Sequence, residues 1–276
     1  RTTREAGGCL EPGDFESLDA NLCEAASCSY EGAEVSAADP QQGGAGILFA
    51  ALRSLEGATL AEARGERYVQ AVAGALAAAW RERCAAYQAP PSPPAQTTHL
   101  CVADRDGMMV SMTFTHGPSW FGSGLLDRET GVLLNTGASI FTRRASDGRI
   151  VALPNVTPVI VRRGDARFAL GSPGGRHIPA IVLQAIVDLV HYRTSPGRLL
   201  GQPRMSADEH GNVDAEAALV AAFPARTRRE IPLGEYYGPA GMIAWEGGCA
   251  TGYTDPRFDG ASLHAGAGPI PGAGER

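Results

Sequence analysis

Thr97 is the residue whose position in this sequence offers a distinct chemistry. It follows a proline-rich run, residues 89–96, and opens a stretch with the pattern of a strand. If the chain is cut before Thr97, this residue carries a hydroxyl and a free α-amine, whose pKa of about 8 lets it accept the hydroxyl proton. The same hydroxyl can make the cut by attacking the carbonyl of Gln96. A threonine that only starts a strand is the alternative, because β-branched residues favour strands.

The glycine-rich turn LGSPGGRH, residues 170–177, is a second candidate. It lies between a predicted strand and a predicted helix, so the backbone N–H groups of Gly174 and Gly175 would form an oxyanion hole at a helix N-terminus. Glycine suits this place because a Cβ would block a substrate carbonyl. A plain tight turn is the alternative, and the GxSxG spacing of a nucleophile elbow fails at Leu170. His177, at the helix start, is expected on the surface.

These two motifs require a sheet that is covered by helices. Helical spacing of apolar residues predicts helices over residues 47–55, 67–88 and 176–192. The Asp106-Gly107 turn between two runs rich in strand-forming residues predicts a hairpin over residues 98–115. Further strands are predicted at residues 131–136, 157–163, 166–170 and 242–247. Helices before and after a central group of strands indicate sheet layers covered by helices.

The composition excludes several classes of function. A chain of 276 residues with 44% hydrophobic content can bury a core as one large domain or two small ones. The net charge is -6 and no run of lysines or arginines occurs, so nucleic acid and anionic membranes are not expected partners. No apolar run approaches the roughly 20 residues of a membrane span. We therefore expect a small-molecule substrate.

The cysteines carry no recognisable pattern of a metal site or a disulfide framework. The six of them are scattered without a CxxC pair: Cys9, Cys23, Cys28, Cys84, Cys101 and Cys249. This favours small buried hydrophobes, although a Cys23–Cys28 disulfide stays open for a secreted protein. No cluster has metal-ligand spacing, so we expect no metal and no cofactor. We expect a cytoplasmic location and leave a secreted or periplasmic one open.

Taken together, these stretches resemble the gamma-glutamyltransferase family of N-terminal nucleophile (Ntn) hydrolases. Three segments carry the resemblance over roughly residues 97–262: TTHLCVADRDGMMVSMTFT, GSPGGRHIPAIVLQAIVDLV and GYTDPRFDGAS, the last similar to the family's Asp-Pro-Arg segment. The resemblance implies an α+β fold, a four-layer αββα sandwich. It also implies that residues 1–96 are the C-terminal part of a large-subunit region. Residues 97–276 would then be the small subunit of the same Ntn-hydrolase domain.

The resemblance also implies roles for single residues. Thr97 would be the nucleophile and Gln96 the residue before the cut. The Thr115 hydroxyl would hydrogen-bond the Thr97 hydroxyl, and Gly174 and Gly175 would form the oxyanion hole. After self-cleavage the small subunit would keep its own large-subunit fragment as a partner, and a homo-oligomer stays open.

The family's substrate-recognition residues are replaced in this sequence. His116 follows the T-x-T motif where the family has asparagine, and the aspartate for the substrate ammonium falls on Ile140. The family's Ser-Ser pair falls on Pro154 and Asn155. Without that aspartate, the ammonium of a γ-glutamyl group would be buried without a partner, which costs several kcal/mol. Ordinary glutathione chemistry is therefore not expected. The candidate substrate-binding residues are His116, Asn135, Ile140, Arg143 and Asn155. Three of them have a structural alternative: His116 as a turn cap, Asn135 as the support of a strand end, and Arg143 as part of a solvated loop.

Several functions stay open at this point. The retained nucleophile and altered pocket resemble divergent homologues from 4-alkylproline antibiotic biosynthesis, which implies hydrolysis of a C–C bond next to a keto carbonyl. A gamma-glutamyl amide hydrolase or transpeptidase is an alternative. So is an acylase of N-acyl metabolites, with Trp120, Phe121 and Ile140 as candidates for an apolar pocket. An inactive scaffold or binding protein is the alternative of another class.

Overall fold

A six-stranded antiparallel sheet lies at the centre of the protein. The computed structural model describes residues 2–16, 22–38, 43–87, 96–117, 121–137, 141–144, 148–223, 228–231, 238 and 240–263. The sheet has the order β1-β2-β7-β8-β12-β13, and each strand is antiparallel to its neighbours. Its strands are β1 (Ala26–Tyr30), β2 (Ala33–Ala37), β7 (Val159–Arg163), β8 (Ala166–Gly171), β12 (Gly241–Glu246) and β13 (Cys249–Thr254). The strands predicted at 157–163, 166–170 and 242–247 are confirmed.

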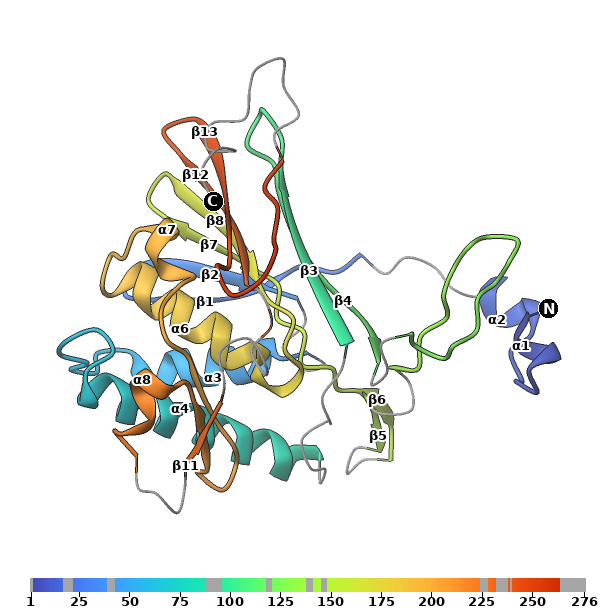
Figure 1. Ribbon diagram of the computed structural model, residues 1–276, viewed down its shortest axis with the longest axis horizontal. Coiled ribbons are helices and arrows are strands. Elements are labelled where there is room, and N and C mark those ends of the chain that lie inside the picture. Colours follow the sequence, from blue (N-terminus) through green and yellow to red (C-terminus); the bar gives the residue numbers. More distant parts are fainter. Residues whose placement is uncertain are drawn as a thin grey trace.

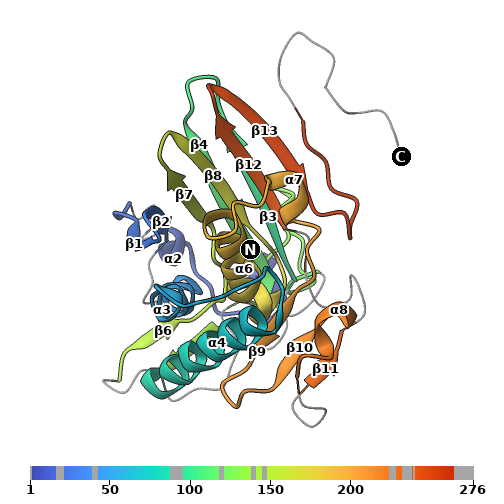
Figure 2. The same ribbon diagram turned by 90° about the vertical axis from the view of Figure 1, so that its left-hand side faces the viewer.

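Helices cover one face of this sheet (Figures 1 and 2). They are α3 (Ala45–Leu55), α4 (Glu66–Tyr87) and α6 (Ile178–Val190), which confirms the three predicted helices. Every residue of α6 is buried, because this helix contacts the sheet through β8 and also contacts α3. An apolar surface all round a helix is typical of such a central position. The helix that follows the glycine-rich turn is therefore firmly fixed.

A two-stranded sheet lies on the opposite face (Figure 1). It consists of β3 (Gln96–Ala103) and β4 (Met109–Gly117), so the predicted hairpin is confirmed. The register pairs Thr97 with Thr115 and shifts between Gln96 and Thr97. Strand β3 contacts β8 and β12, and β4 contacts β7 and β8. The start of the hairpin is thus held against the central sheet.

The remaining elements are short. A three-stranded sheet contains β9 (Met205–Ala207), β10 (Val213–Ala215) and β11 (Arg228–Glu230), and a two-stranded one contains β5 (Thr142–Arg144) and β6 (Ile150–Ala152). Short helices are α1 (Thr2–Glu5), α2 (Pro12–Glu16), η1 (Gly175–His177), α7 (Pro196–Leu199) and α8 (Ala217–Val220). The prediction of a strand at 131–136 is wrong. Residues 123–127 run beside this stretch and share backbone hydrogen bonds with it, but the two segments form only one bridge, between Leu126 and Leu133, and no continuous ladder.

The architecture thus combines one helix layer with two sheet layers, which is an α+β arrangement. These are three layers of the expected four-layer sandwich. The described helices on the outer side of the β3–β4 hairpin are α1 and α2, which lie apart from it, beyond the loop that follows β4 (Figure 1). Within the same part of the chain, no helix has both the length and the hydropathy that crossing a bilayer requires.

Candidate active site

The inner face of β3 leads from the central sheet to Thr97. Residues Thr97, His99 and Cys101 alternate on this half-buried face. The Cys101 thiol donates to the Ala169 carbonyl oxygen at 3.3 Å, and the His99 ring lies against Gly171, where an added Cβ would come within 2.3 Å of it. Strand β3 therefore runs opposite to β8. Continuing two residues from His99, Thr97 lies beyond the end of β8, where the glycine-rich turn begins.

His99 and Cys101 form a neutral pair rather than a second nucleophile. The His99 Nδ1 atom lies 2.8 Å from the Thr113 hydroxyl, and Nε2 lies 3.1 Å from the Cys101 sulfur. Burial lowers the pKa of His99 to about 4 and raises the pKa of the Cys101 thiol to about 12. At neutral pH the imidazole is uncharged and the sulfur stays protonated, whereas a nucleophilic cysteine needs the thiolate. Their role is to fix the hairpin on the sheet.

The peptide bond before Thr97 has a hydrogen-bond donor on its carbonyl. The Thr115 hydroxyl donates to the Gln96 oxygen at 2.8 Å and accepts the Gly117 N–H at 3.2 Å. The predicted hydrogen bond between the Thr115 and Thr97 hydroxyls concerns the cleaved protein, so it stays a prediction. In the intact chain the Gln96 carbonyl occupies the position facing the Thr115 hydroxyl.

The glycine-rich turn has the backbone conformation that requires glycine. Gly174 has a φ of 128° and Gly175 a φ of 57°, both in the region that other residues rarely adopt. The turn leads through η1 into α6, and the His177 N–H donates to the Gly174 carbonyl oxygen at 3.0 Å. Backbone N–H groups at such a start of a helix attract a negative charge. The oxyanion role of the Gly174 and Gly175 N–H groups stays a prediction.

His177 is buried, so the prediction of a surface position is wrong. Its Nε2 atom lies 3.8 Å from an Asp214 carboxylate oxygen, and Arg229 donates to both oxygens of that carboxylate at 2.9 and 2.7 Å. Burial lowers the pKa of His177 to about 4. The reason for its burial is the three-stranded sheet of β9, β10 and β11, which covers the end of the turn and which the local pattern did not reveal.

A network of buried charges is connected to the glycine-rich turn through the Gly238 carbonyl oxygen and Ser172. Asp255 and Arg257, from the Asp-Pro-Arg segment, pair with Arg204 and Glu216, and Arg257 reaches Glu216 through two bonds of 2.8 and 2.7 Å. The Arg204 guanidinium also donates to the Gly238 carbonyl oxygen at 3.1 Å, and the same oxygen accepts the Ser172 hydroxyl at 3.1 Å. The Asp-Pro-Arg segment is therefore a structural anchor. Arg204 and Glu216 were not predicted, because no local sequence pattern marks them as partners of this segment.

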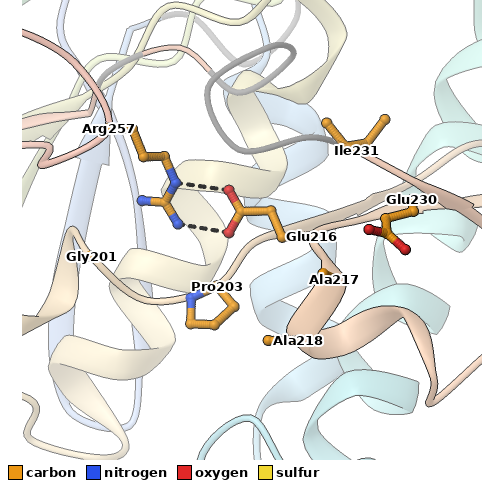
Figure 3. Close-up of a pocket in the computed structure, with 8 residues that line it drawn as sticks. All are labelled: Gly201, Pro203, Glu216, Ala217, Ala218, Glu230, Ile231 and Arg257. Atoms are coloured by element: carbon orange, nitrogen blue, oxygen red, sulfur yellow. Dashed lines mark hydrogen bonds and ion pairs between the residues drawn. The ribbon is translucent and has the colours of Figure 1, made fainter.

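A pocket of about 290 Å³ lies beside this anchor (Figure 3). Arg257 and Glu216 both line it and are joined to each other by two hydrogen bonds. None of the predicted site residues lines it; its residues are Gly201, Pro203, Glu216, Ala217, Ala218, Glu230, Ile231 and Arg257. Because its buried charges neutralise each other, we assign this pocket no part in the chemistry.

A series of contacts connects the hairpin to the other predicted substrate residues. The Thr136 N–H donates to the His116 carbonyl oxygen at 2.9 Å, and the Asn135 side chain accepts the Gly137 N–H at 3.0 Å. Asn135 thus holds this loop, which was the structural alternative to a substrate contact for this residue. The Phe141 ring lies against Gly137, and the Leu153 N–H reaches the Phe141 carbonyl. Ile140 and Trp120 lie outside the described residues.

Two of the predicted substrate residues have buried polar atoms available for a ligand. Asn155 is only 4% exposed, and its Oδ1 atom has no hydrogen-bond partner in the described part of the chain. The same holds for the Nδ1 atom of half-buried His116. Arg143 donates to the neighbouring Thr142 carbonyl and is half-buried in β5. Buried polar atoms without a partner are costly, so their presence favours a binding role for Asn155 and His116.

Comparison with known proteins settles the family. The family model described as Gamma-glutamyltranspeptidase matches residues 80–265, which contain the hairpin, the glycine-rich turn and the Asp-Pro-Arg segment. The chain belongs to the gamma-glutamyltranspeptidase family. This confirms the resemblance noted in the sequence, and with it the assignment to Ntn hydrolases. No group of three or more potential metal ligands occurs in the residues the structure describes.

Relatives of this gamma-glutamyltranspeptidase-family chain are longer than it is. The Glutathione hydrolase proenzyme of Escherichia coli is 31% identical over an alignment of 125 residues, and the match covers 40% of this chain and 21% of that protein. The Acylase ACY 1 proenzyme of Pseudomonas sp. strain V22 is 30% identical over an alignment of 182 residues, and the match covers 61% of this chain and 32% of that protein. The chain thus spans a fifth to a third of the length of these relatives.

A solved structure confirms the fold over nearly the whole chain. Cephalosporin acylase from Bacillus halodurans superimposes with a TM-score of 0.75 at 20% identity. The match covers 94% of this chain and 56% of the acylase chain. The predicted α+β fold of an Ntn hydrolase is therefore confirmed.

Proposed function

We propose that this protein is a self-processing hydrolase whose nucleophile is Thr97 and whose processing site is the Gln96–Thr97 bond. The observation that supports this most directly is the 2.8 Å hydrogen bond from the Thr115 hydroxyl to the Gln96 carbonyl oxygen. A donor on this oxygen draws electron density from the carbonyl carbon and stabilises the oxyanion that forms on attack. The nucleophile that our proposal requires is on the very next residue.

Processing uses only groups of this chain and water. The Thr97 Oγ atom attacks the Gln96 carbonyl carbon, the C–N bond to Thr97 breaks, and the released nitrogen takes up the hydroxyl proton. The product is an ester of Gln96 with the Thr97 side chain. Water then hydrolyses this ester, which leaves a carboxylate on Gln96 and a free α-amine beside the Thr97 hydroxyl.

The processed site has a base, a nucleophile and an oxyanion site. The Thr97 amine, with a pKa of about 8, accepts the proton of the Thr97 hydroxyl as this attacks the substrate. The N–H groups of Gly174 and Gly175 stabilise the negative charge that develops on the substrate oxygen. The His99 ring, packed against Gly171, keeps the hairpin and the turn at a fixed distance.

For the substrate we propose a small keto acid derived from an amino acid, of the kind used to make 4-alkylproline antibiotics. The Thr97 Oγ atom adds to the keto carbon, and the adjacent C–C bond breaks. Its electron pair leaves on carbon as a stabilised carbanion, which takes up a proton. Water hydrolyses the remaining ester and regenerates Thr97, so the net reaction is hydrolysis of a C–C bond.

The residue types at the candidate substrate positions support an anionic substrate. The position where the family resemblance places an ammonium-binding aspartate is Ile140 in this chain. The described candidates offer instead the guanidinium of Arg143 and the imidazole of His116, while the unpartnered Oδ1 atom of Asn155 would accept a hydrogen bond from an N–H or O–H group of the substrate. Cations and hydrogen-bond donors suit the carboxylate of a keto acid, whereas an ammonium needs a carboxylate partner.

Hydrolysis of a gamma-glutamyl or N-acyl amide is the second candidate. It is favoured by the 30% identity to Acylase ACY 1 over 61% of this chain, because that relative is named for acyl chemistry. The same nucleophile and oxyanion site would serve, with an amine instead of a carbanion as the leaving group.

Intact-mass measurement of the purified protein tests the processing step. We expect two fragments that separate between Gln96 and Thr97, and a single uncut chain for Thr97→Ala. Thr98→Ala is the matched control, because Thr98 is the neighbouring threonine on the exposed face of β3 and should be cut normally. An uncut wild-type chain would lack the free amine on which the mechanism depends. The protein would then be interpreted as an inactive scaffold or binding protein.

Substrate assays on the processed protein separate the two candidates. The protein is incubated with a chromogenic gamma-glutamyl anilide and, separately, with keto acids that have a cleavable C–C bond next to the keto carbonyl. Two carbon fragments from a keto acid, seen by mass spectrometry, support C–C hydrolysis. Release of the anilide chromophore alone supports the amide hydrolase and contradicts our first choice.

A further inference from the structure

Arg83 joins the last part of α4 to the segment that carries Asn155. Its Nη2 atom donates to the Leu153 carbonyl oxygen at 2.9 Å and to the Pro154 carbonyl oxygen at 3.2 Å. Its Nη1 atom donates to the Gly43 carbonyl oxygen at 3.2 Å. One side chain thus connects the residues before α3 with the residues between β6 and β7, which lie far from each other in the sequence.

The Arg83 side chain is half-buried and carries its charge. Burial lowers the pKa of the guanidinium to about 10, so the group keeps its proton at neutral pH. The guanidinium carbon lies over the Trp80 ring, 5.7 Å from the ring centre. A guanidinium has five N–H donors in a rigid plane, so it can hold several carbonyl oxygens at once. Hydrogen bonds with one charged partner are also stronger than bonds between neutral groups.

Residues 153–158 have no regular secondary structure, yet four successive carbonyl groups in this segment each accept a hydrogen bond. These four groups belong to Leu153, Pro154, Asn155 and Val156. Arg83 donates to the first two, the Thr157 hydroxyl to the third at 2.9 Å, and the Gly44 N–H to the fourth at 3.1 Å. Since an irregular segment has no ladder to satisfy its backbone groups, such donors fix its conformation.

Gly44, the residue just before α3, lies directly against this segment. A Cβ at this position would come within 2.2 Å of the Thr157 Oγ1 atom and within 2.4 Å of the Asn155 carbonyl oxygen. Glycine therefore permits a close approach that a side chain would block. Gly44 and Arg83 both precede the proposed cleavage site after Gln96, whereas Asn155 follows it. The backbone around Asn155 is thus held by residues from the other side of that cleavage site.

We propose that Arg83 is a positioning residue of the substrate site, which acts by fixing the backbone that carries Asn155. This inference rests on the proposed function, because it takes Asn155 as a substrate contact. The Asn155 side chain is only 4% exposed, and its Oδ1 atom has no hydrogen-bond partner in the described part of the chain. That atom would accept a hydrogen bond from an N–H or O–H group of the substrate. A misplacement of about 1 Å in such a contact can cost about 10²-fold.

The reacting groups of the proposed mechanism do not depend on Arg83. Its three hydrogen bonds reach neither the β3–β4 hairpin, which carries Thr97 and Thr115, nor the glycine-rich turn. Loss of Arg83 should therefore weaken substrate binding and leave self-cleavage and the chemical step nearly unchanged. A purely structural role would instead lower cleavage, kcat and substrate binding together.

Steady-state kinetics of Arg83 variants test this proposal. The keto-acid probe is acetylpyruvate, whose C–C hydrolysis takes up one water and yields oxalate and acetone; the amide probe is a chromogenic gamma-glutamyl anilide. For Arg83→Met we expect normal self-cleavage, a KM raised about tenfold or more, and a kcat within about threefold of the wild type. Arg83→Lys keeps the charge and should recover part of the loss.

Arg81→Met is the matched control. Arg81 lies on the same helix, is exposed, and donates one hydrogen bond, to the Glu209 carbonyl oxygen at 3.3 Å. Its replacement removes a guanidinium from α4 without touching residues 153–157. We expect KM and kcat within about twofold of the wild type, as is usual for a surface substitution away from a site.

Hydrogen exchange of two amides tests the positioning without any substrate. The Gly44 N–H donates to the segment, and the Leu153 N–H within the segment donates to the Phe141 carbonyl oxygen at 2.8 Å. Both amides should exchange at least several-fold faster in Arg83→Met than in the wild type, because the segment opens more often once its two carbonyl groups lose their donor. Arg81→Met should show the wild-type rates.

Thr157→Val is a second variant, used where Arg83→Met fails to fold. It keeps the shape of the fully buried Thr157 side chain and removes the donor on the Asn155 carbonyl oxygen. KM should again rise with little change in kcat, because the same backbone is released at the next carbonyl group. A wild-type KM in a folded Thr157→Val protein would contradict the proposal.

The outcomes separate this inference from the proposed function. A folded Arg83→Met protein with the wild-type KM, or with unchanged exchange of the two amides, overturns the role of Arg83. Equal losses in kcat and KM with no recovery in Arg83→Lys also overturn it. An uncut wild-type chain overturns the proposed function, and the substrate role of Arg83 falls with it. A cleaved wild type that acts on neither probe contradicts both proposed substrate classes, and the exchange rates then decide whether Arg83 fixes the segment.

Discussion

Replacing Thr115 by valine should slow self-cleavage while leaving the fold intact. Valine has the shape of threonine without the hydroxyl, so the change removes the 2.8 Å hydrogen bond to the Gln96 carbonyl oxygen and the 3.2 Å hydrogen bond that the hydroxyl accepts from the Gly117 N–H. Loss of one donor from an oxyanion site typically lowers a rate by about 10² to 10³-fold. Thr115 is only half-buried, so water replaces part of the interaction. We therefore expect a decrease of about 10²-fold, or about 2.7 kcal/mol in activation free energy.

The assay is the fraction of uncut chain over time, measured by intact mass after purification at low temperature. Thr115→Ser keeps a hydroxyl and is the matched control, with a rate expected within about tenfold of the wild type. A Thr115→Val protein that cleaves as fast as the wild type would refute the assignment of this hydroxyl to the cleavage step. A Thr115→Val protein that is merely unfolded is recognised by its circular dichroism.

Three further changes probe the parts that position the site. Arg257→Met leaves the buried Glu216 carboxylate without its partner and should cost about 3–5 kcal/mol in the free energy of unfolding, measured by urea titration; an unchanged midpoint would contradict the anchor. Gly171→Ala places a Cβ 2.3 Å from the His99 ring, so it should lower the free energy of unfolding by about 1–3 kcal/mol and slow self-cleavage. The added change His99→Ala should partly restore both. Because burial lowers the pKa of His99 to about 4, the unfolded chain binds a proton before the folded chain does, so stability should fall as the pH decreases from about 6.5 to 4. His99→Gln should make this part of the pH profile less steep, and the remaining slope is expected from His177, whose pKa burial also lowers to about 4; an equally steep profile would contradict the contribution of His99.

Local pattern was sufficient to predict the hairpin, the helices and the glycine-rich turn. Alternation of side chains and the Asp106-Gly107 turn are properties of neighbouring residues, and so is the change from a strand to a helix around Gly174. The same reasoning failed at residues 131–136, because the neighbouring segment 123–127 pairs with them too irregularly for a continuous ladder. Only one bridge, between Leu126 and Leu133, occurs there.

The environment of single side chains was beyond local prediction. His177 is buried by a sheet whose strands follow it by 28 residues or more along the chain, and its neighbour Asp214 has no sequence signal of its own. The pairing of Arg204 with Asp255 joins segments 51 residues apart. Such contacts depend on the whole packing of the fold, so the Asp-Pro-Arg segment was noticed from the sequence while its partners were not.

The partner of Thr115 connects the two stages of the proposed chemistry. In the intact chain its hydroxyl donates to the carbonyl of Gln96, the bond to be cut. Cleavage creates the Thr97 amine and lets the Gln96 carboxylate leave, so the same hydroxyl becomes available to Thr97. One side chain thus assists first the processing reaction and then the nucleophile that processing produces. The register of β3 against β4 supports this proposal, because it pairs Thr97 with Thr115 and so places the hydroxyl beside residue 97 already in the intact chain.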